Sequence, residues 1–370
     1  MKLLFLTVIP SPYQRQLFST IASSGEVEIK VFYYASSASD RQWKRPDFFD
    51  YERVLPGYSK DILGATTYWN PSANSEVKKF APDVVIVSDY SSLTAQVVMR
   101  GLAKQDVPMI YWGEVPGFSK RGAIGRKARQ LLQTPLRRAA AIAGIGEVAV
   151  EAYEKLFPDK PTLNIPYFCD LEPFQQARSK ATRNKQTVDV LFSGQMIERK
   201  GVDILLAAFD RIARRRPNLR LVLLGNGPEK ERYYASVLAE LRDRVLFLGH
   251  KDPEDLPSVF ASADIFCLPS RHDGWGVVVN EALGAGLPIV VSDAVGAGRD
   301  LVSQGVNGFI TPAQDARALS KALEKLAIDP DLRCDMARAS SLAAKSWGVD
   351  EGARRWIAAA REVLSRRRQV

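Results

Sequence analysis

The sequence predicts an α/β protein made of two consecutive domains, each built on a parallel β-sheet. The chain has 370 residues, of which 46% are hydrophobic and 25% charged, so it is too long for one ordinary core and has the composition of a soluble globular protein. Short apolar, β-branched runs alternate with amphipathic segments, which is typical of βαβ units. A polar stretch near the middle separates two such series.

The apolar runs place the strands. In the first half the expected strands are residues 2–8, 27–34, 83–88, 108–112, 140–145 and 162–166. In the second half they are residues 188–194, 219–225, 244–249, 264–269 and 288–293. Residues 201–217 carry apolar side chains at helical spacing, which predicts an amphipathic helix between two of these strands.

The polar stretch "QQARSKATRNKQ" has no apolar periodicity and is interpreted as a linker. We therefore expect a first domain at 1–169, a linker at 170–186, a second domain at 187–350, and a last helix at 351–370 that returns to the first domain. In open parallel sheets ligands bind beyond the carboxyl ends of the strands. Two such domains facing each other make a cleft that suits a two-substrate enzyme.

Net charge and cysteine content indicate the type of binding partner and the cellular compartment. The formal charge of +9 favours anionic partners, although charge alone does not choose among them. Cys169, Cys267 and Cys334 have no paired spacing, and we expect them to be reduced and buried in a cytoplasmic protein. The first apolar run stops at Pro10 and is interpreted as a strand rather than a signal peptide. No stretch approaches the roughly 18 apolar residues that a transmembrane helix needs.

The first motif is "FSGQMIERKGVDILLAAF", residues 192–209. A strand ends at Gly194, the loop carries Arg199 and Lys200, and a helix is expected to begin near Gly201. Two cations beside unpaired amide N–H groups form a site that binds phosphate. The alternative is two solvated loop cations, but positive charge at a helix start opposes the helix dipole unless an anion is bound.

The second motif is "LGNGPEKER", residues 224–232. Gly225 and Gly227 follow a strand, and Pro228 and Glu229 are expected to open a helix. The glycines let a ligand approach the backbone closely, although such turns also use glycine for purely local reasons. Its position at the same edge of the sheet as the phosphate loop favours the interpretation that it binds a ligand.

The third motif is "RHDGWGVVVNEALGAGLP", residues 271–288, interpreted as a strand exit loop and a short helix closed by Gly284 or Gly286. Asp273 falls in the loop and Glu281 on the second turn of the helix. A carboxylate accepts two hydrogen bonds from neighbouring hydroxyls, so Glu281 suits a ribose diol and Asp273 suits sugar hydroxyls. The amides around Gly276 and Val277 add a second anion site. The alternative is a loop cap and a surface helix residue.

In this order the three motifs resemble the donor-binding domain of glycosyltransferase family 4. The resemblance covers nearly all of the second domain, whereas the first domain is similar only in architecture. It implies the GT-B fold, with two Rossmann-like domains facing across a cleft and a C-terminal helix crossing back. It also implies transfer of a sugar from a nucleotide-diphosphate sugar, with retention at the anomeric carbon and no cofactor.

The resemblance implies that Lys200 holds the donor diphosphate, Glu281 the ribose, and Asp273 the transferred sugar. The remaining donor-binding positions are Gly194, Gln195, Gly225, Asn226, Gly227, Pro228, Gly274, Trp275, Gly276 and Val277. Two positions depart from the family pattern. The first acid of the family is usually Glu and is here Asp273, and the phosphate-binding Arg is here Gln195, which lacks a charged fork. Arg199 is the nearest replacement.

The acceptor side is expected in the first domain. Pro10, Ser11 and Tyr13 follow its first strand, and Asp89 and Glu114 follow later strands. In the family a histidine near the last of these positions helps to place donor or acceptor. Because the chain has only two histidines, both in its second half, Glu114 is assigned that role, with a structural carboxylate as the alternative.

Metal and membrane expectations come from two charged segments. The only Asp-x-Asp, Asp329 and Asp331, lies between helical patterns and is interpreted as a capping turn. We therefore predict transfer without a metal ion. Cations and helix N-termini would neutralise the leaving diphosphate instead. Residues 119–140 carry seven basic and no acidic residues, which suits an anionic bilayer or a solvated helix face. Without interleaved aromatic residues the segment does not favour nucleic acid.

These patterns together predict a glycosyltransferase, cytoplasmic or peripheral on the inner face of the membrane, acting on a glycan or lipid-linked acceptor in polysaccharide or lipopolysaccharide assembly. Two alternatives stay open: a noncatalytic GT-B protein that binds a nucleotide sugar or a partner, and a GT-B sugar-nucleotide epimerase. A dinucleotide oxidoreductase is disfavoured because no GxGxxG follows the first strand.

Overall fold

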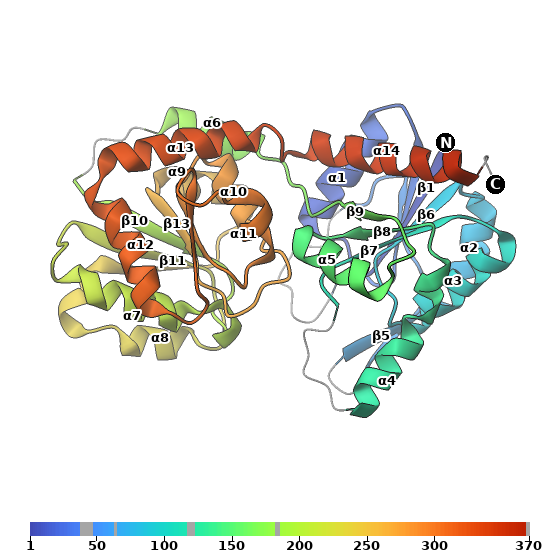
Figure 1. The fold of residues 1–370 in the computed structure, drawn as a ribbon, viewed down its shortest axis with the longest axis horizontal. Coiled ribbons are helices and arrows are strands. Elements are labelled where there is room, and N and C mark those ends of the chain that lie inside the picture. Colours follow the sequence, from blue (N-terminus) through green and yellow to red (C-terminus); the bar gives the residue numbers. More distant parts are fainter. Residues whose placement is uncertain (38–46, 63–64, 117–122, 182–185, 368–370) are drawn as a thin grey trace. The chain divides into compact units, whose positions relative to one another are not determined.

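The computed structural model describes residues 1–37, 47–62, 65–116, 123–181 and 186–367. The chain forms two compact units (Figure 1). Unit 1 comprises Met1–Phe168 and Val349–Val370, and unit 2 comprises Cys169–Gly348. Each unit is an α/β structure on its own parallel sheet, as the sequence predicted.

Unit 1 contains a seven-stranded parallel sheet with the strand order β3-β2-β1-β6-β7-β8-β9. Its strands are β1 (Lys2–Thr7), β2 (Glu28–Tyr33), β3 (Glu52–Val54), β6 (Val84–Val87), β7 (Met109–Gly113), β8 (Ala141–Gly144) and β9 (Thr162–Asn164). The six strands expected in this half are confirmed. Strand β3 and the antiparallel hairpin of β4 (Tyr58–Ile62) and β5 (Ala65–Trp69) were not expected.

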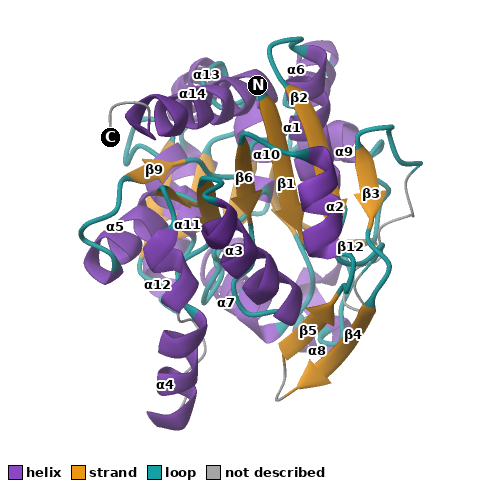
Figure 2. Cartoon of the chain, turned by 90° about the vertical axis from the view of Figure 1, so that its right-hand side faces the viewer, coloured by secondary structure: helices purple, strands orange, loops and turns teal. Residues whose placement is uncertain are grey.

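Helices cover the sheet of unit 1 (Figure 2). They are α1 (Pro12–Ser23), α2 (Ala73–Phe80), α3 (Leu93–Gln105), α4 (Ala123–Leu132), α5 (Glu147–Leu156) and α14 (Val349–Arg367). Helix α14 packs on α1, and the buried Trp356 meets Phe5 and Trp112 edge-on at centroid distances of 5.4 and 5.2 Å. This aromatic cluster explains why the last helix belongs to unit 1.

Unit 2 contains a six-stranded parallel sheet with the order β12-β11-β10-β13-β14-β15. Its strands are β10 (Val188–Ser193), β11 (Leu219–Leu224), β12 (Val245–Gly249), β13 (Ile265–Leu268), β14 (Ile289–Ser292) and β15 (Gly308–Thr311). The five expected strands are confirmed, and β15 is additional. The order is that of a Rossmann sheet, whose direction of winding reverses between β10 and β13.

The helices of unit 2 include a segment expected to be irregular. They are α6 (Glu172–Lys180), α7 (Val202–Ala213), α8 (Lys230–Ser236), α9 (Leu256–Ser262), α10 (Val278–Gly284), α11 (Gly296–Leu301), α12 (Ala316–Ile328) and α13 (Pro330–Ala344), with 3₁₀ turns η2 (Glu198–Lys200) and η3 (Ala239–Arg244). Helix α6 lies inside the expected linker. Its Phe174 is buried edge-on against Phe260 of α9, so one aromatic side chain docks an otherwise polar helix.

Two further expectations have clear outcomes. Cys169 and Cys267 are buried, but Cys334 on α13 is exposed, so the expectation of three buried thiols was wrong for this residue. Asp329 caps α13 by accepting a hydrogen bond of 2.8 Å from the Leu332 amide, which confirms the capping turn. Within the ranges described above, no helix is both long and apolar enough to span a membrane.

Candidate functional site

Three loops of unit 2 meet where the winding of its sheet reverses. They follow β10 (residues 194–201), β11 (225–229) and β13 (269–277), and they carry the three sequence motifs. The Met196 amide donates to the Asn226 carbonyl at 2.8 Å, and the Arg271 amide donates to the Arg199 carbonyl at 2.8 Å. The backbone therefore ties the first loop to both of the others.

Glycine is required where these loops touch. A Cβ at Gly225 would fall inside van der Waals contact with the Gly194 carbonyl oxygen, and one at Gly227 would meet the carbonyl oxygen of Met196. Gly225 also has a φ of 129°, which L side chains rarely adopt. Close packing of two loops thus explains the glycines of the second motif. This is the alternative to ligand binding that the sequence left open.

An ion pair joins the first and third loops. The Lys200 Nζ atom lies 2.5 Å from Oδ2 of Asp273, and Arg199 Nη1 lies 3.5 Å from Oδ1 of the same carboxylate. The side chains of Lys200 and Asp273 are only 12% and 11% exposed, so water screens their attraction less than it would at the surface. Both expected phosphate-loop cations therefore converge on the expected sugar-binding acid.

Backbone hydrogen bonds hold Asp273 in place. Its amide donates to the Ala294 carbonyl at 2.9 Å, and its carbonyl accepts from the Gly296 amide at 3.0 Å. These bonds come from the loop after β14 and the start of α11. The carboxylate is consequently fixed at the carboxyl edge of the sheet, as the sequence predicted.

Arg271, two positions before Asp273 in the sequence, pairs with a different acid. The Arg271 guanidinium instead binds both carboxylate oxygens of Asp203, in the first turn of α7, at 2.8 and 2.6 Å. This hydrogen-bonded pair holds the pKa of Asp203 below its usual value. His272 uses its backbone carbonyl to accept a hydrogen bond from Arg199 at 2.8 Å, and burial lowers the pKa of its imidazole. The Arg271–Asp203 pair was not anticipated.

Glu281 lies in the first turn of α10, one turn earlier than expected. The residue is half-buried, yet its Oε2 atom is fully buried and has no hydrogen-bond partner in the described part of the chain. Burial raises the pKa of this carboxyl to about 8. A buried acceptor without a partner costs free energy, whereas the accessible part of this half-buried residue is what a ligand can contact.

The other donor-side positions differ in accessibility. The Trp275 side chain is only 1% exposed and donates through Nε1 to Asn280 at 2.9 Å, so its ring is part of the core and only its backbone can face a ligand. Gly274 and Gly276 are buried, and Val277 is half-buried. Gln195, Asn226 and Pro228 have exposed side chains at the loop surface.

In unit 1 the structure brings Tyr13 and Glu114 to one tyrosine. The rings of Tyr13 and Tyr167 lie 5.0 Å apart, and the Tyr167 hydroxyl donates to Oε1 of Glu114 at 3.3 Å. Tyr167 was missed from the sequence, although its place just after a strand was a usable signal. Pro10 and Ser11, which precede Tyr13 in the sequence, are buried. The Ser11 hydroxyl has no hydrogen-bond partner within the described residues.

Asp89 has a structural task in the loop before α3. Its carboxylate accepts hydrogen bonds from the Ser91 amide at 2.7 Å, the Ser91 hydroxyl at 2.8 Å and the Ser92 amide at 3.0 Å. Ser92 is in turn the N-cap of α3. These bonds are those of a turn that caps a helix, and they occupy both carboxylate oxygens.

Comparison with known proteins matches the part of the chain that holds the three loops. Residues 173–342 match the family model described as glycosyl transferases group 1. An uncharacterized glycosyltransferase of Haemophilus influenzae is 30% identical over 168 residues, which are 45% of this chain and about half (47%) of that protein. A D-inositol 3-phosphate glycosyltransferase of Pseudarthrobacter chlorophenolicus is 28% identical over 91% of this chain and 86% of its own length.

The fold also has a counterpart in a ligand complex. The structure of Anabaena HepE in complex with UDP aligns with a TM-score of 0.75 and 20% identity, covering 98% of this chain and 100% of that one. This likeness confirms the GT-B fold. The group 1 match and the named relatives support a glycosyltransferase enzyme.

Proposed function

We propose that the protein is a retaining, family 4 type glycosyltransferase that moves a sugar from a nucleotide-diphosphate sugar to a glycan or lipid-linked acceptor. The observation that carries the proposal is the convergence of Lys200, Arg199 and Asp273 on two loops at the switch point of the unit 2 sheet. Ligands of such sheets bind at this point. The group 1 match contains these loops, which favours donor binding there.

Each residue has a distinct task in this proposal. Lys200 neutralises the diphosphate as the bond to the sugar breaks, and Asp273, released from the ammonium group, accepts hydrogen bonds from the sugar hydroxyls. Arg199 supplies the second cation that Gln195 does not, and its side chain is 42% exposed and available to a diphosphate. Glu281, which is half-buried, accepts a hydrogen bond from the ribose. No step in this scheme calls for a metal ion.

A thermal-shift screen tests the donor side without a known acceptor. Wild type and Glu281→Ala are heated with UDP, GDP, ADP, dTDP or CMP, each as a sugar conjugate, because ligands that bind only the folded state raise its melting temperature. We expect one nucleotide to stabilise the wild type by a few degrees and the variant much less. The shift should persist in the presence of EDTA. No shift with any nucleotide would favour the noncatalytic alternative, and a shift that needs manganese would contradict metal-free binding.

On the acceptor side, we propose that unit 1 holds a lipid-linked acceptor at an anionic membrane surface. Helix α4 presents Lys127 and Leu131, four residues apart and both exposed, with Leu131 70% exposed. Exposed Tyr58 and Ile62 lie on the β4–β5 hairpin. Figure 2 shows α4 and the hairpin projecting from the end of unit 1 toward which β1 points. Residues 119–122 of the basic segment lie outside the described residues.

Vesicle sedimentation tests this membrane contact. The wild type is expected to bind vesicles of phosphatidylglycerol more strongly than vesicles of phosphatidylcholine, and added salt should weaken the binding because it screens charge. Lys127→Glu with Leu131→Glu should abolish the difference. Arg317→Glu on α12, an exposed charge reversal in unit 2, is the control and should leave it intact. Equal binding of both variants to anionic vesicles would rule out α4 as the contact.

A further inference from the structure

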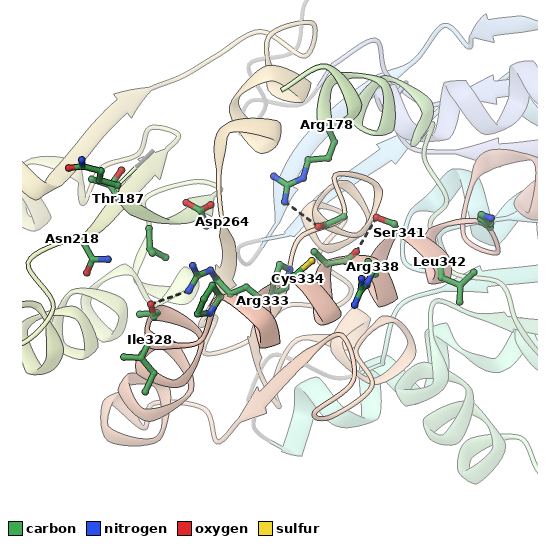
Figure 3. Close-up of a pocket in the computed structure, with 18 residues that line it drawn as sticks. Arg178, Thr187, Asn218, Asp264, Ile328, Arg333, Cys334, Arg338, Ser341 and Leu342 are labelled. Carbon is green, nitrogen blue, oxygen red and sulfur yellow. Dashed lines mark hydrogen bonds between the residues drawn. The ribbon is translucent and has the colours of Figure 1, made fainter. Parts of the chain in front are cut away.

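A pocket of unit 2 lies at the opposite ends of the sheet strands from Lys200 and Asp273. It has a volume of about 810 Å³. Thr187, Asp264 and Pro288 line it, and each directly precedes a strand, namely β10, β13 and β14. Residues from the end of α12 and along α13 form its other wall (Figure 3). The pocket therefore shares no lining residue with the three loops.

The lining of this pocket is strongly cationic. Its charged residues are Arg178, Arg333, Arg338, Lys345 and the single acid Asp264. Asp264 already accepts a hydrogen bond of 2.8 Å from the Asp189 amide at the start of β10. Arg338 also pairs with Asp335 on the same helix, so four cations face two acids and the excess is two positive charges, which suits an anion of about two negative charges. Asn218 and Ser341 add neutral polar groups.

Two of the guanidinium groups are held in position by helix ends. Arg178 Nη1 donates to the Ala261 and Ala263 carbonyls at 3.0 and 2.9 Å. Arg333 Nη1 donates to two carbonyls at the end of α12, at 2.5 Å to Leu326 and at 3.0 Å to Ala327. Figure 3 shows Arg333 among the residues that line the pocket. The Arg333 guanidinium has five N–H donors, of which its bonds to Leu326 and Ala327 use only those of the Nη1 group. Positioned donors lose little entropy when they bind an anion.

We propose that this pocket binds a small molecule carrying a phosphate or diphosphate group, at a site separate from the donor site. Its volume is within the range of about 300–1,000 Å³ for ligand pockets. One guanidinium group can donate two parallel N–H bonds to two oxygens of a phosphate. A lining with several guanidinium groups therefore favours phosphate groups over neutral ligands. This inference goes beyond glycosyl transfer and does not rest on it.

A ligand in this pocket would affect the position of α10, the helix that carries Glu281. Gly286 and Pro288, which line the pocket, follow α10 directly, and α10 packs against α13. The Ser340 hydroxyl of α13 donates to the Leu287 carbonyl at 2.7 Å. An anion held by α13 would therefore stabilise the packing that positions α10.

Cys334 reports directly on occupancy. It lines the pocket and is the single exposed cysteine of the three in the chain, since Cys169 and Cys267 are buried. The native protein reacts with the thiol reagent DTNB at constant ionic strength, with chloride replaced stepwise by pyrophosphate. At about ten times its dissociation constant pyrophosphate is expected to slow the reaction of Cys334 about tenfold. Unchanged rates throughout the titration would overturn the proposal.

Two variants separate this site from the donor site. Arg338→Gln with Lys345→Gln changes two exposed side chains of the pocket and should remove most of the protection. Lys200→Ala disables the proposed donor site and should leave the protection intact. The opposite pattern, with protection lost in Lys200→Ala and kept in the double variant, would refute a separate site. Stronger protection by glycerol phosphate than by inorganic phosphate would identify an organic phosphate as the ligand.

Discussion

Replacing Lys200 with alanine is expected to lower kcat/KM for sugar transfer by a factor of about 10² to 10³, the usual effect of removing one group that stabilises developing charge. Lys200 is largely buried and lies 2.5 Å from Asp273. Water therefore cannot replace its ammonium group beside a leaving diphosphate. The rate of sugar transfer, or of donor hydrolysis without acceptor, measures the effect with the donor found by thermal shift.

A double variant separates two causes of this loss. Lys200→Ala removes the cation and also leaves Asp273 without its nearest counter-ion, while Arg199 remains 3.5 Å away. If the stranded carboxylate is responsible, the Lys200→Ala, Asp273→Asn double variant is as active as Asp273→Asn alone. If the missing cation is responsible, as we propose, the double variant is much less active than Asp273→Asn alone. Lys251→Ala, an exposed cation beyond β12, is the control. A Lys200→Ala enzyme within twofold of wild type would refute the assignment.

Glu281 is expected to make the folded protein less stable as the pH rises from 5 to 8. Burial raises the pKa of its carboxyl from 4.5 to about 8 in the folded state. Between these values the folded chain keeps a proton that the unfolded chain has lost. Stability then falls with pH, by up to about 1.4 kcal/mol per pH unit. The contribution is fully present below pH 4.5 and is lost as the pH rises through about 8.

Denaturant unfolding of wild type and Glu281→Gln at pH 5, 6, 7 and 8 measures this effect. Glutamine does not ionise. Between pH 5 and pH 8 the unfolding free energy of the wild type should therefore fall by roughly 3 kcal/mol relative to that of the variant. Glu254→Gln, an exposed carboxyl before α9, should run parallel to wild type. Parallel curves for Glu281→Gln would mean that the carboxyl titrates normally in the folded protein.

Local pattern predicted much of the fold because each buried strand is a short apolar run and each helix repeats its apolar residues every three to four positions. All eleven expected strands form, and α7 begins at Val202, next to the expected Gly201. Four of the described strands escaped prediction. Strands β3 and β15 have only three and four residues, and β4, exposed throughout, pairs with β5 in a two-stranded hairpin. A strand without a buried face has no alternation in its sequence. Helix α6 was missed for the same reason, since Phe174 is its single fully buried side chain.

The sequence by itself determined the chemical groups and the loops that carry them: two cations after β10, two glycines after β11, and an acid after β13. Only the tertiary structure decided their partners. Asp273 pairs with Lys200, 73 positions earlier in the chain, because the order of the sheet places β13 beside β10. The tertiary structure also left Glu281 with a buried oxygen that forms no hydrogen bond to any described residue, and it placed arginines of α6 and α13 around one pocket. Spacing along a chain fixes which edge of a sheet a loop reaches, whereas strand order and packing between distant segments fix which side chains meet there.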